Sequence, residues 1–100
     1  MATQTPPGDN TNNPRAESLI EYPSLFPIKV MGHKVDGLVH AISMIAQQFD
    51  PAFDAKTIEL RESKGGNYLG VTITVTATSR EQLDELYRTL STHPMVKVVL

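Results

Sequence analysis

The residue types that most often carry catalysis or bind metals are scarce in this sequence. Its 100 residues include three histidines and no cysteine, which excludes disulfides, thiolate metal ligands and Cys nucleophiles. No Ser stands in a G-x-S-x-G turn, no H-E-x-x-H pair is present, and no carboxylates are spaced as an acid/base pair. The sequence therefore predicts a protein that is not an enzyme and that has no metal site and no cofactor.

The segment from Met31 to Gly37 is the better candidate for binding a small molecule. It falls between an expected strand and an expected helix, where free amides and the helix dipole favour an anion and glycines let a ligand approach the backbone. We predict a small-carboxylate site formed by Gly32, His33, Asp36 and Gly37. The alternative is that the two glycines only form a tight turn.

A second glycine-containing segment, Ser63-Lys64-Gly65-Gly66, resembles a phosphate-binding loop only superficially. A P-loop needs G-x-x-x-x-G-K-[ST] leading into a helix whose N-terminal amides face the anion. Here Gly-Gly joins two strand-like segments, so the pattern favours a hairpin turn with a solvated Lys64 over an anion site.

The charge of the chain is unevenly distributed. The formal net charge is −2, and residues 1–22 account for all of it, because residues 23–100 carry eight acids and eight bases. A neutral domain is a poor partner for DNA, RNA or anionic lipid. Residues 1–16, rich in Pro, Thr and Asn, are predicted to be a disordered tail, and residues 17–100 a single domain. No membrane-length apolar run or signal peptide is seen, which predicts a cytoplasmic protein with no membrane partner.

Hydrophobic periodicity predicts six elements. They are a strand at 25–31, a helix at 36–49, strands at 57–62 and 68–78, a helix at 79–92 and a strand at 95–100. Asp36 is the expected N-cap of the first helix, and Ser79 with Gln82 forms a capping box for the second. In the last strand, strict alternation puts Val96, Val98 and Leu100 on one side and Lys97 and Val99 on the other.

The βαββαβ order predicts an α+β ferredoxin-like sandwich, a four-stranded antiparallel sheet with two helices on one face. The other face of the sheet should be open and available to a second copy or a protein partner. We predict that its interaction surface comprises Lys29, Lys64, Gly65, Gly66, Asn67, Tyr68, Thr72 and Thr74.

RNA-recognition domains share this order, but they stack bases on aromatic side chains of the central strands. Threonine side chains at 72 and 74 cannot stack, and Tyr68 stands at the strand start without a flanking basic run. The sequence therefore predicts no nucleic-acid partner.

Several blocks of residues together resemble the YbeD family of small bacterial proteins. The blocks, in order over about residues 18–100, are Tyr22-Pro23, Phe26-Pro27-Ile28-Lys29-Val30-Met31-Gly32, Ser63-Lys64-Gly65-Gly66-Asn67-Tyr68, Ile73-Thr74-Val75-Thr76-Ala77, Leu86-Tyr87 and Val98-Val99-Leu100. This resemblance implies a fold similar to ACT domains, the small-molecule-sensing modules of metabolic enzymes, and a gene setting often near lipoate synthesis. It carries over no catalytic residues.

Two functions remain open from the sequence. The first is a non-catalytic regulatory protein, an ACT-like homodimer that senses a small carboxylate metabolite linked to lipoate metabolism. The second is an adaptor that docks on a metabolic enzyme without a small ligand.

Overall fold

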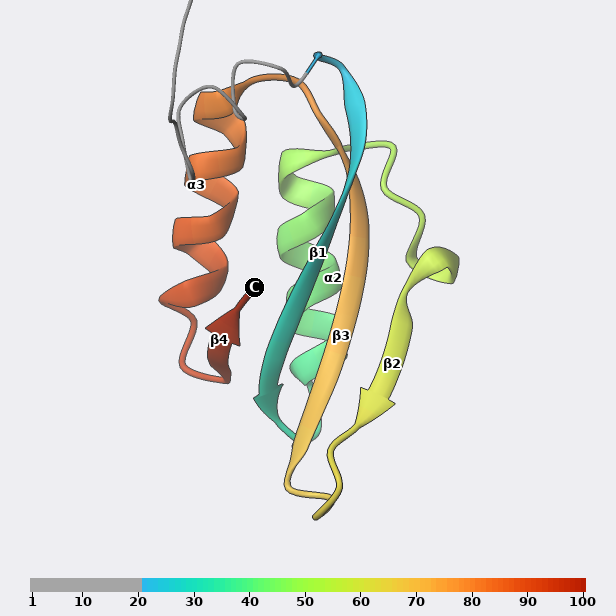
Figure 1. The fold of residues 1–100 in the computed structure, drawn as a ribbon, viewed down its shortest axis with the longest axis vertical. Helices are drawn as coiled ribbons and strands as arrows, with labels where there is room; N and C mark the ends of the chain where they lie inside the picture. Colours follow the sequence, from blue (N-terminus) through green and yellow to red (C-terminus); the bar gives the residue numbers. More distant parts are fainter. Residues whose placement is uncertain (1–20) are drawn as a thin grey trace, which may run out of the picture.

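The computed structural model describes residues 21–100, so the predicted disordered tail at 1–16 lies outside the described residues. The elements follow the predicted βαββαβ order (Figure 1). They are β1 (Ser24–His33), α2 (Leu38–Phe49), the short 3-10 helix η2 (Ala55–Thr57), β2 (Glu59–Glu62), β3 (Tyr68–Ala77), α3 (Arg80–Ser91) and β4 (Val96–Val99).

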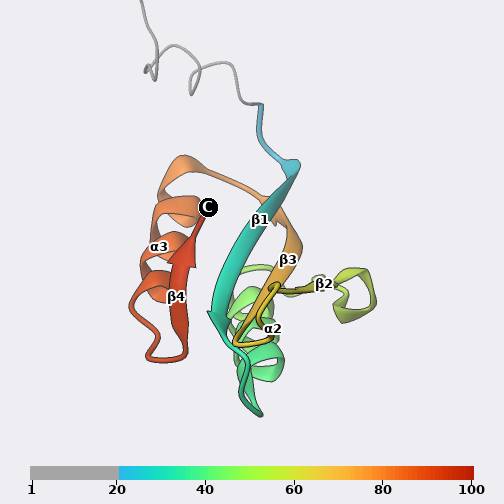
Figure 2. The same ribbon diagram turned by 60° about the horizontal axis from the view of Figure 1, so that its bottom comes forward.

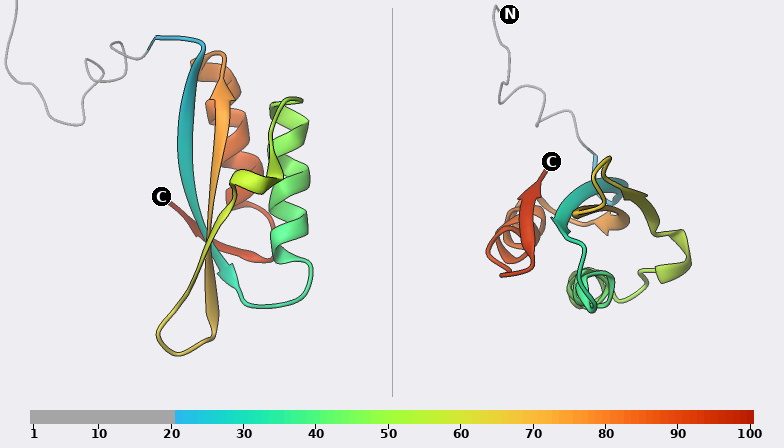
Figure 3. Two further views of the ribbon diagram at one scale, coloured as in Figure 1. Left: turned by 90° about the vertical axis from the view of Figure 1, so that its right-hand side faces the viewer. Right: turned by 90° about the horizontal axis from the view of Figure 1, so that it is seen from below.

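The four strands form one antiparallel sheet in the order β2-β3-β1-β4, so the two long strands lie in the centre (Figure 2). In the central pair, Ile28 is opposite Ile73 and Lys29 is opposite Thr72. Both helices, α2 and α3, pack on the same side of the sheet, and no other element of residues 21–100 covers the opposite side (Figure 3). The predicted ferredoxin-like α+β sandwich is confirmed.

The core lies between the helices and the inner face of the sheet. Alternate residues of β1 and β3 point inward, as the period of two in their sequences predicts. The helices add apolar positions spaced three or four residues apart. The largest fully buried side chains are Ile28, Val30, Leu38, Ile42, Val71, Ile73, Val75, Leu86 and Leu90.

Polar side chains hold the ends of the helices against the end of β3. Ser79 accepts a hydrogen bond from Gln82 N, as predicted for the capping box, while Gln82 Oε1 accepts from Thr78 N. The same Gln82 side chain donates to Phe49 O and so links the start of α3 to the end of α2. Within residues 21–100, Asp50 is the one charged side chain that is buried. Its carboxylate accepts from Thr76 N at 2.9 Å and from Ala52 N at 3.0 Å.

The segment before α2 differs from the prediction. β1 continues to His33, two residues beyond the expected end, because its pairing with β3 extends to the Tyr68 position. Asp36 does not cap α2. The N-cap is Gly37, in the left-handed conformation with φ of 92° and no side-chain cap hydrogen bond. A left-handed backbone suits glycine, which has no Cβ to clash.

β4 also differs, since its register against β1 shifts between Met31 and Gly32. Met31 is opposite Val98 and Gly32 is opposite Val96, which leaves Lys97 as an extra residue. Val96 and Val99 both pack on the core, whereas Lys97 and Val98 are exposed. The predicted strict alternation of this strand was therefore wrong, because a bulge inserts one residue and changes the sides.

Candidate functional site

The outer face of the sheet is not covered by α2 or α3 (Figure 3), and it is built in rows. β1 contributes Lys29, Met31 and His33, which lie opposite Thr72, Gly70 and Tyr68 of β3. The edge strand β2 extends two of these rows, with Glu59 opposite Thr72 and Arg61 opposite Gly70. We call this surface, together with the β2–β3 hairpin at 62–67, the open face.

A groove of about 730 Å³ lies on the open face. Its lining includes Lys29, Met31, Glu59, Arg61, Tyr68 and Thr72. Gly70, in the middle of β3, also lines the groove and adds no side chain to it. A glycine inside a strand weakens the strand and often marks a place where another group approaches the backbone. The walls of the groove therefore combine charged residues with apolar ones such as Met31, Leu60 and Leu100, and its floor at Gly70 has no side chain.

One end of the open face carries a cluster from three strands. The rings of His33 and Tyr68 lie 5.6 Å apart between centroids, at 39° to each other. Lys97 Nζ lies 5.7 Å from the centroid of the Tyr68 ring, a cation–π distance. The bulge in β4 explains this arrangement, because bulges redirect side chains and here expose Lys97 on the same side as its neighbour Val98.

The β2–β3 hairpin lies against the loop that follows β1. Lys34 N donates to Asn67 O at 3.0 Å, and the Lys34 ammonium forms an ion pair with Glu62. Ser63 Oγ accepts from Tyr68 N, which closes the hairpin. Sequence reasoning treated the loop and the hairpin as two separate candidate sites, and the structure brings them together.

The predicted interaction surface is mostly contiguous. Lys29, Lys64, Tyr68 and Thr72 line the groove, and Thr74 follows in the next row of the same face. Gly65, Gly66 and Asn67 lie at the hairpin turn, where Gly66 has a φ of 77°. Sequence reasoning missed Met31, Glu59, Arg61, Gly70 and Lys97. For the first four, the antiparallel register would have shown their positions, whereas Lys97 depends on a bulge that leaves no local signal.

The residues of the predicted carboxylate site are divided. Gly32 is buried in β1, and a Cβ there would lie 2.4 Å from Met95 O and 2.7 Å from Leu38 Cδ1. His33 belongs to the open-face cluster, opposite Tyr68. Asp36 and Gly37 are exposed at the start of α2. The close packing around Gly32 explains the requirement for glycine at that position without a ligand.

The basic side chains of the open face have few ionic partners. Among residues 21–100, neither Lys29 nor Arg61 nor Lys64 forms an ion pair, and Lys97 rests on an aromatic ring. On α3, by contrast, Arg80 pairs with Asp84, and Arg88 pairs with Glu85. The open face therefore presents several cationic groups that have no ion-pair partner among residues 21–100.

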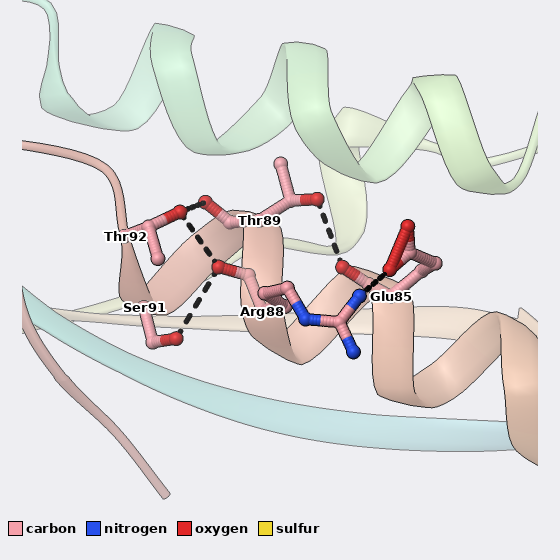
Figure 4. A network of polar contacts seen from close by, with 5 residues as sticks. All are labelled: Glu85, Arg88, Thr89, Ser91 and Thr92. Carbon is pink, nitrogen blue, oxygen red and sulfur yellow. Dashed lines mark hydrogen bonds and ion pairs between the residues drawn. The ribbon is translucent and has the colours of Figure 1, made fainter.

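The polar groups in the second half of α3 bond within the helix itself (Figure 4). Thr89 Oγ1 donates to Glu85 O at 2.8 Å, and Thr92 Oγ1 donates to Arg88 O at 2.8 Å. Ser91 Oγ also donates to Arg88 O, at 3.3 Å. These bonds satisfy carbonyl groups near the C-terminal end of the helix, which is a structural role.

Neither metal chemistry nor a membrane span is indicated by the part of the chain that the structure describes. Within residues 21–100 no three His, Asp or Glu side chains are grouped so that they could hold a metal ion. None of the helices there has the length and apolar character needed to cross a bilayer. The arrangement on the open face suits binding through charge, shape and hydrogen bonds.

Comparison with known sequences identifies a family. The family model described as "Protein of unknown function (DUF493)" matches residues 17–100. A UPF0250 protein of Leptothrix cholodnii is 69% identical over 87 residues, which cover 87% of this chain and 96% of the relative. A UPF0250 protein of Ralstonia nicotianae is 59% identical over 96 residues, covering 96% of this chain and 99% of that protein.

Comparison with solved structures identifies proteins of similar fold. The solution structure of protein HP0495 from H. pylori superposes with a TM-score of 0.70 at 16% identity and covers 91% of each chain. The ACT domain from the GTP pyrophosphokinase of Chlorobium tepidum superposes with a TM-score of 0.63 at 19% identity, covering 78% of this chain and 96% of that one. At these identities the likeness concerns the fold alone, and the predicted ACT-like fold is confirmed.

Proposed function

We propose that this chain, which belongs to the DUF493 family of proteins of unknown function, is a non-catalytic regulatory protein that acts in the cytoplasm by binding a protein partner on its open face. The YbeD family that the sequence resembles is this same family. The partner is an enzyme that the protein regulates or a second copy of the chain.

The observation that carries this proposal is the groove of about 730 Å³ on a sheet face that neither α2 nor α3 covers (Figure 3). Exposed apolar side chains lie beside the charged residues of this face, since Leu25 is 72% exposed and Leu100 is 69% exposed. Both belong to the open face, because Leu25 is opposite Thr76 and Leu100 lines the groove. Interfaces combine such apolar contacts with a polar surround.

Site-specific photocrosslinking in living cells tests this proposal. A photoreactive phenylalanine replaces Thr74 on the open face in one variant and Glu81, which is exposed on α3, in a matched control. We expect a defined protein adduct from position 74 and none from position 81. Adducts of equal yield from both positions, or none from position 74 in a folded variant, would contradict the proposal.

A second candidate function is the sensing of a small carboxylate metabolite at residues 32–37. It is supported by the start of α2, where Gly37 provides no side-chain cap and the helix N-terminus favours an anion. Thermal-shift screening with amino acids, octanoate and lipoate tests it. An increase in melting temperature with one of them, removed by Gly37→Ala but retained in Tyr68→Ala, is the expected result, and no shift in the folded protein argues against it.

A further inference from the structure

The described part of the chain is electrostatically two-sided. The open face carries two acidic side chains, Glu59 and Glu62. With Lys34 counted beside its ion-pair partner Glu62, it carries five basic ones, which are Lys29, Lys34, Arg61, Lys64 and Lys97. The rest of residues 21–100 carries three basic side chains and seven acidic ones: Lys56, Arg80 and Arg88 against Glu21, Asp36, Asp50, Asp54, Glu81, Asp84 and Glu85. The domain is close to neutral as a whole, yet its open face has a formal charge of +3 and the remainder −4.

The basic groups are arranged around the groove. Lys29 and Arg61 lie in neighbouring rows at its wall, and neither has an ion-pair partner among residues 21–100. Lys97 is directed to the same face by the bulge in β4 and lies over Tyr68. Opposite charge on a partner lowers the repulsion between such groups and steers the encounter.

The shape of the groove indicates an extended occupant. Gly70 gives the floor no side chain, and the threonine at 72 extends it along β3 with a small one. Lys29 on β1 and Arg61 on β2 lie in neighbouring rows on the two sides of β3, so an extended peptide that lies along β3 passes between two cationic side chains. A bulky folded surface would reach the floor less easily than a single strand.

Nucleic acid fits this face less well than a carboxylate-bearing peptide. Base stacking requires a free aromatic face, and the Tyr68 ring already contacts both His33 and Lys97. Glu59 lies in the same groove as Lys29 and would repel a continuous line of phosphates. Carboxylates spaced along a peptide can meet the cations and avoid Glu59 and Glu62, the two acids that line the groove.

The geometry points to an extended acidic segment of a partner protein as the occupant of the groove, with its carboxylates facing Lys29, Arg61 and Lys97. This inference rests on the proposed function, because it names the chemistry of the partner that the open face binds. If the inference holds, the affinity for the partner depends on the charges of these basic residues and not only on the surface area that is buried.

Fluorescence anisotropy with defined peptides tests the inference. The probe is a labelled peptide of about ten residues in which glutamate alternates with valine, a length typical of a long strand. The matched probe carries glutamine at each glutamate position. We expect binding of the glutamate peptide at low salt, weakening by about tenfold or more between about 50 mM and about 300 mM salt, where screening shortens the Debye length. Equal binding of the glutamine peptide would overturn the inference.

Two variants with the same change in net charge locate the site. Lys29→Glu with Arg61→Glu alters the groove, and Lys56→Glu with Arg88→Glu alters the other side of the molecule. We expect the first pair to lose at least about tenfold in affinity and the second to stay within about twofold. Circular dichroism establishes that both are folded. Equal losses in the two variants would show attraction to net charge alone and overturn the inference.

The remaining outcomes separate the possible partners. Tighter binding of a labelled uridine oligonucleotide than of the glutamate peptide would overturn the inference in favour of nucleic acid. Salt-sensitive self-association in light scattering, abolished by the groove variant, would also overturn it, because the acidic partner would then be the α3 side of a second copy. If neither peptide binds while the crosslink at position 74 persists, the inference of an acidic partner segment is wrong and the proposed function stands.

Discussion

The two faces of the sheet are made by the same two strands and have opposite properties. On the inner face, Ile28, Ile73 and Val75 are fully buried under the helices. On the outer face, Lys29 is exposed, and Thr72 and Thr74 are partly exposed. Since successive residues of a strand point to opposite sides, a shift of one position separates a core residue from a surface residue. Alternate residues of the same two strands therefore build the core and the solvent-facing surface on which we propose binding.

The polar contacts of the two sides differ in the same way. On the helix side, Asp50 and Gln82 bond backbone groups and fix the ends of elements. On the open face, the contacts of His33, Tyr68 and Lys97 join side chains of three strands and leave their outer sides exposed. The first kind of contact satisfies buried groups, whereas the second lies on the surface where we propose binding.

The largest expected difference between the faces follows from truncating neighbouring residues of β3. Ile73→Ala removes a fully buried side chain and should lower the free energy of unfolding by about 3 kcal/mol, the usual cost of a large-to-small core substitution. Thr74→Ala, on the open face, should cost less than about 1 kcal/mol, the span of β-propensity. Urea denaturation followed by circular dichroism measures both.

Equal losses of stability in Ile73→Ala and Thr74→Ala would contradict the assignment of one face to the core and the other to the solvent. They would mean that the open face is covered in the folded protein, for example in a stable dimer. Repeating the denaturation at several protein concentrations distinguishes this case, because the stability of a dimer depends on protomer concentration.

A smaller contrast is expected between two glycines, one on each face. A Cβ at Gly32 would lie 2.4 Å from the backbone oxygen of Met95, so Gly32→Ala should destabilise the fold by about 2 kcal/mol through overpacking. A Cβ at Gly70 would meet Arg61 O at 3.3 Å, and Gly70→Ala should change stability by no more than about 0.5 kcal/mol.

Thermal and urea unfolding of the two alanine variants measure this contrast. Gly70→Ala narrows the groove. Reduced crosslinking from position 74 together with unchanged stability would indicate that Gly70 affects binding on the open face and not the fold. A destabilisation by Gly70→Ala as large as that by Gly32→Ala would contradict it.

The sequence was sufficient for the fold because its strongest pattern extends over a whole central strand. In β3, five alternate positions, 69 to 77, are apolar, and the structure buries Val71, Ile73, Val75 and Ala77. The capping role of Ser79 was likewise predictable, since it depends on residues three apart. Both patterns involve residues that are close in sequence, so they can be recognised without knowing how distant segments pair.

The site was only partly predictable, because it depends on pairing between distant segments. Tyr68 and His33 meet through the β1–β3 register, and the extra residue at Lys97 becomes visible only when β4 is aligned with β1. Asp36 was expected to cap α2 from its residue type, but the chain enters the helix through a left-handed Gly37. Residue type predicts a cap only when the backbone conformation before the helix is also known.

The smallest expected effect concerns Tyr87, a residue of α3 at the margin of the core. Burial raises the pKa of its phenol above the ordinary value of 10.0, because desolvation disfavours the charged phenolate. A raised pKa in the folded state means that the stabilisation from the neutral phenol is fully present below the unfolded pKa and is lost as pH rises through the folded pKa. Tyr87 should therefore weaken the fold only in alkaline solution.

Comparison of the native chain with Tyr87→Phe from about pH 8 to about pH 11 tests this. The difference in free energy of unfolding between the two proteins should be constant up to about pH 10 and then change in favour of the phenylalanine variant, which has no group to ionise. Parallel pH profiles would show that the phenol is as well solvated in the folded state as in the unfolded one. Tyr87 would then count as a surface residue of α3, and the core on this helix would be limited to fully buried residues such as Leu86 and Leu90.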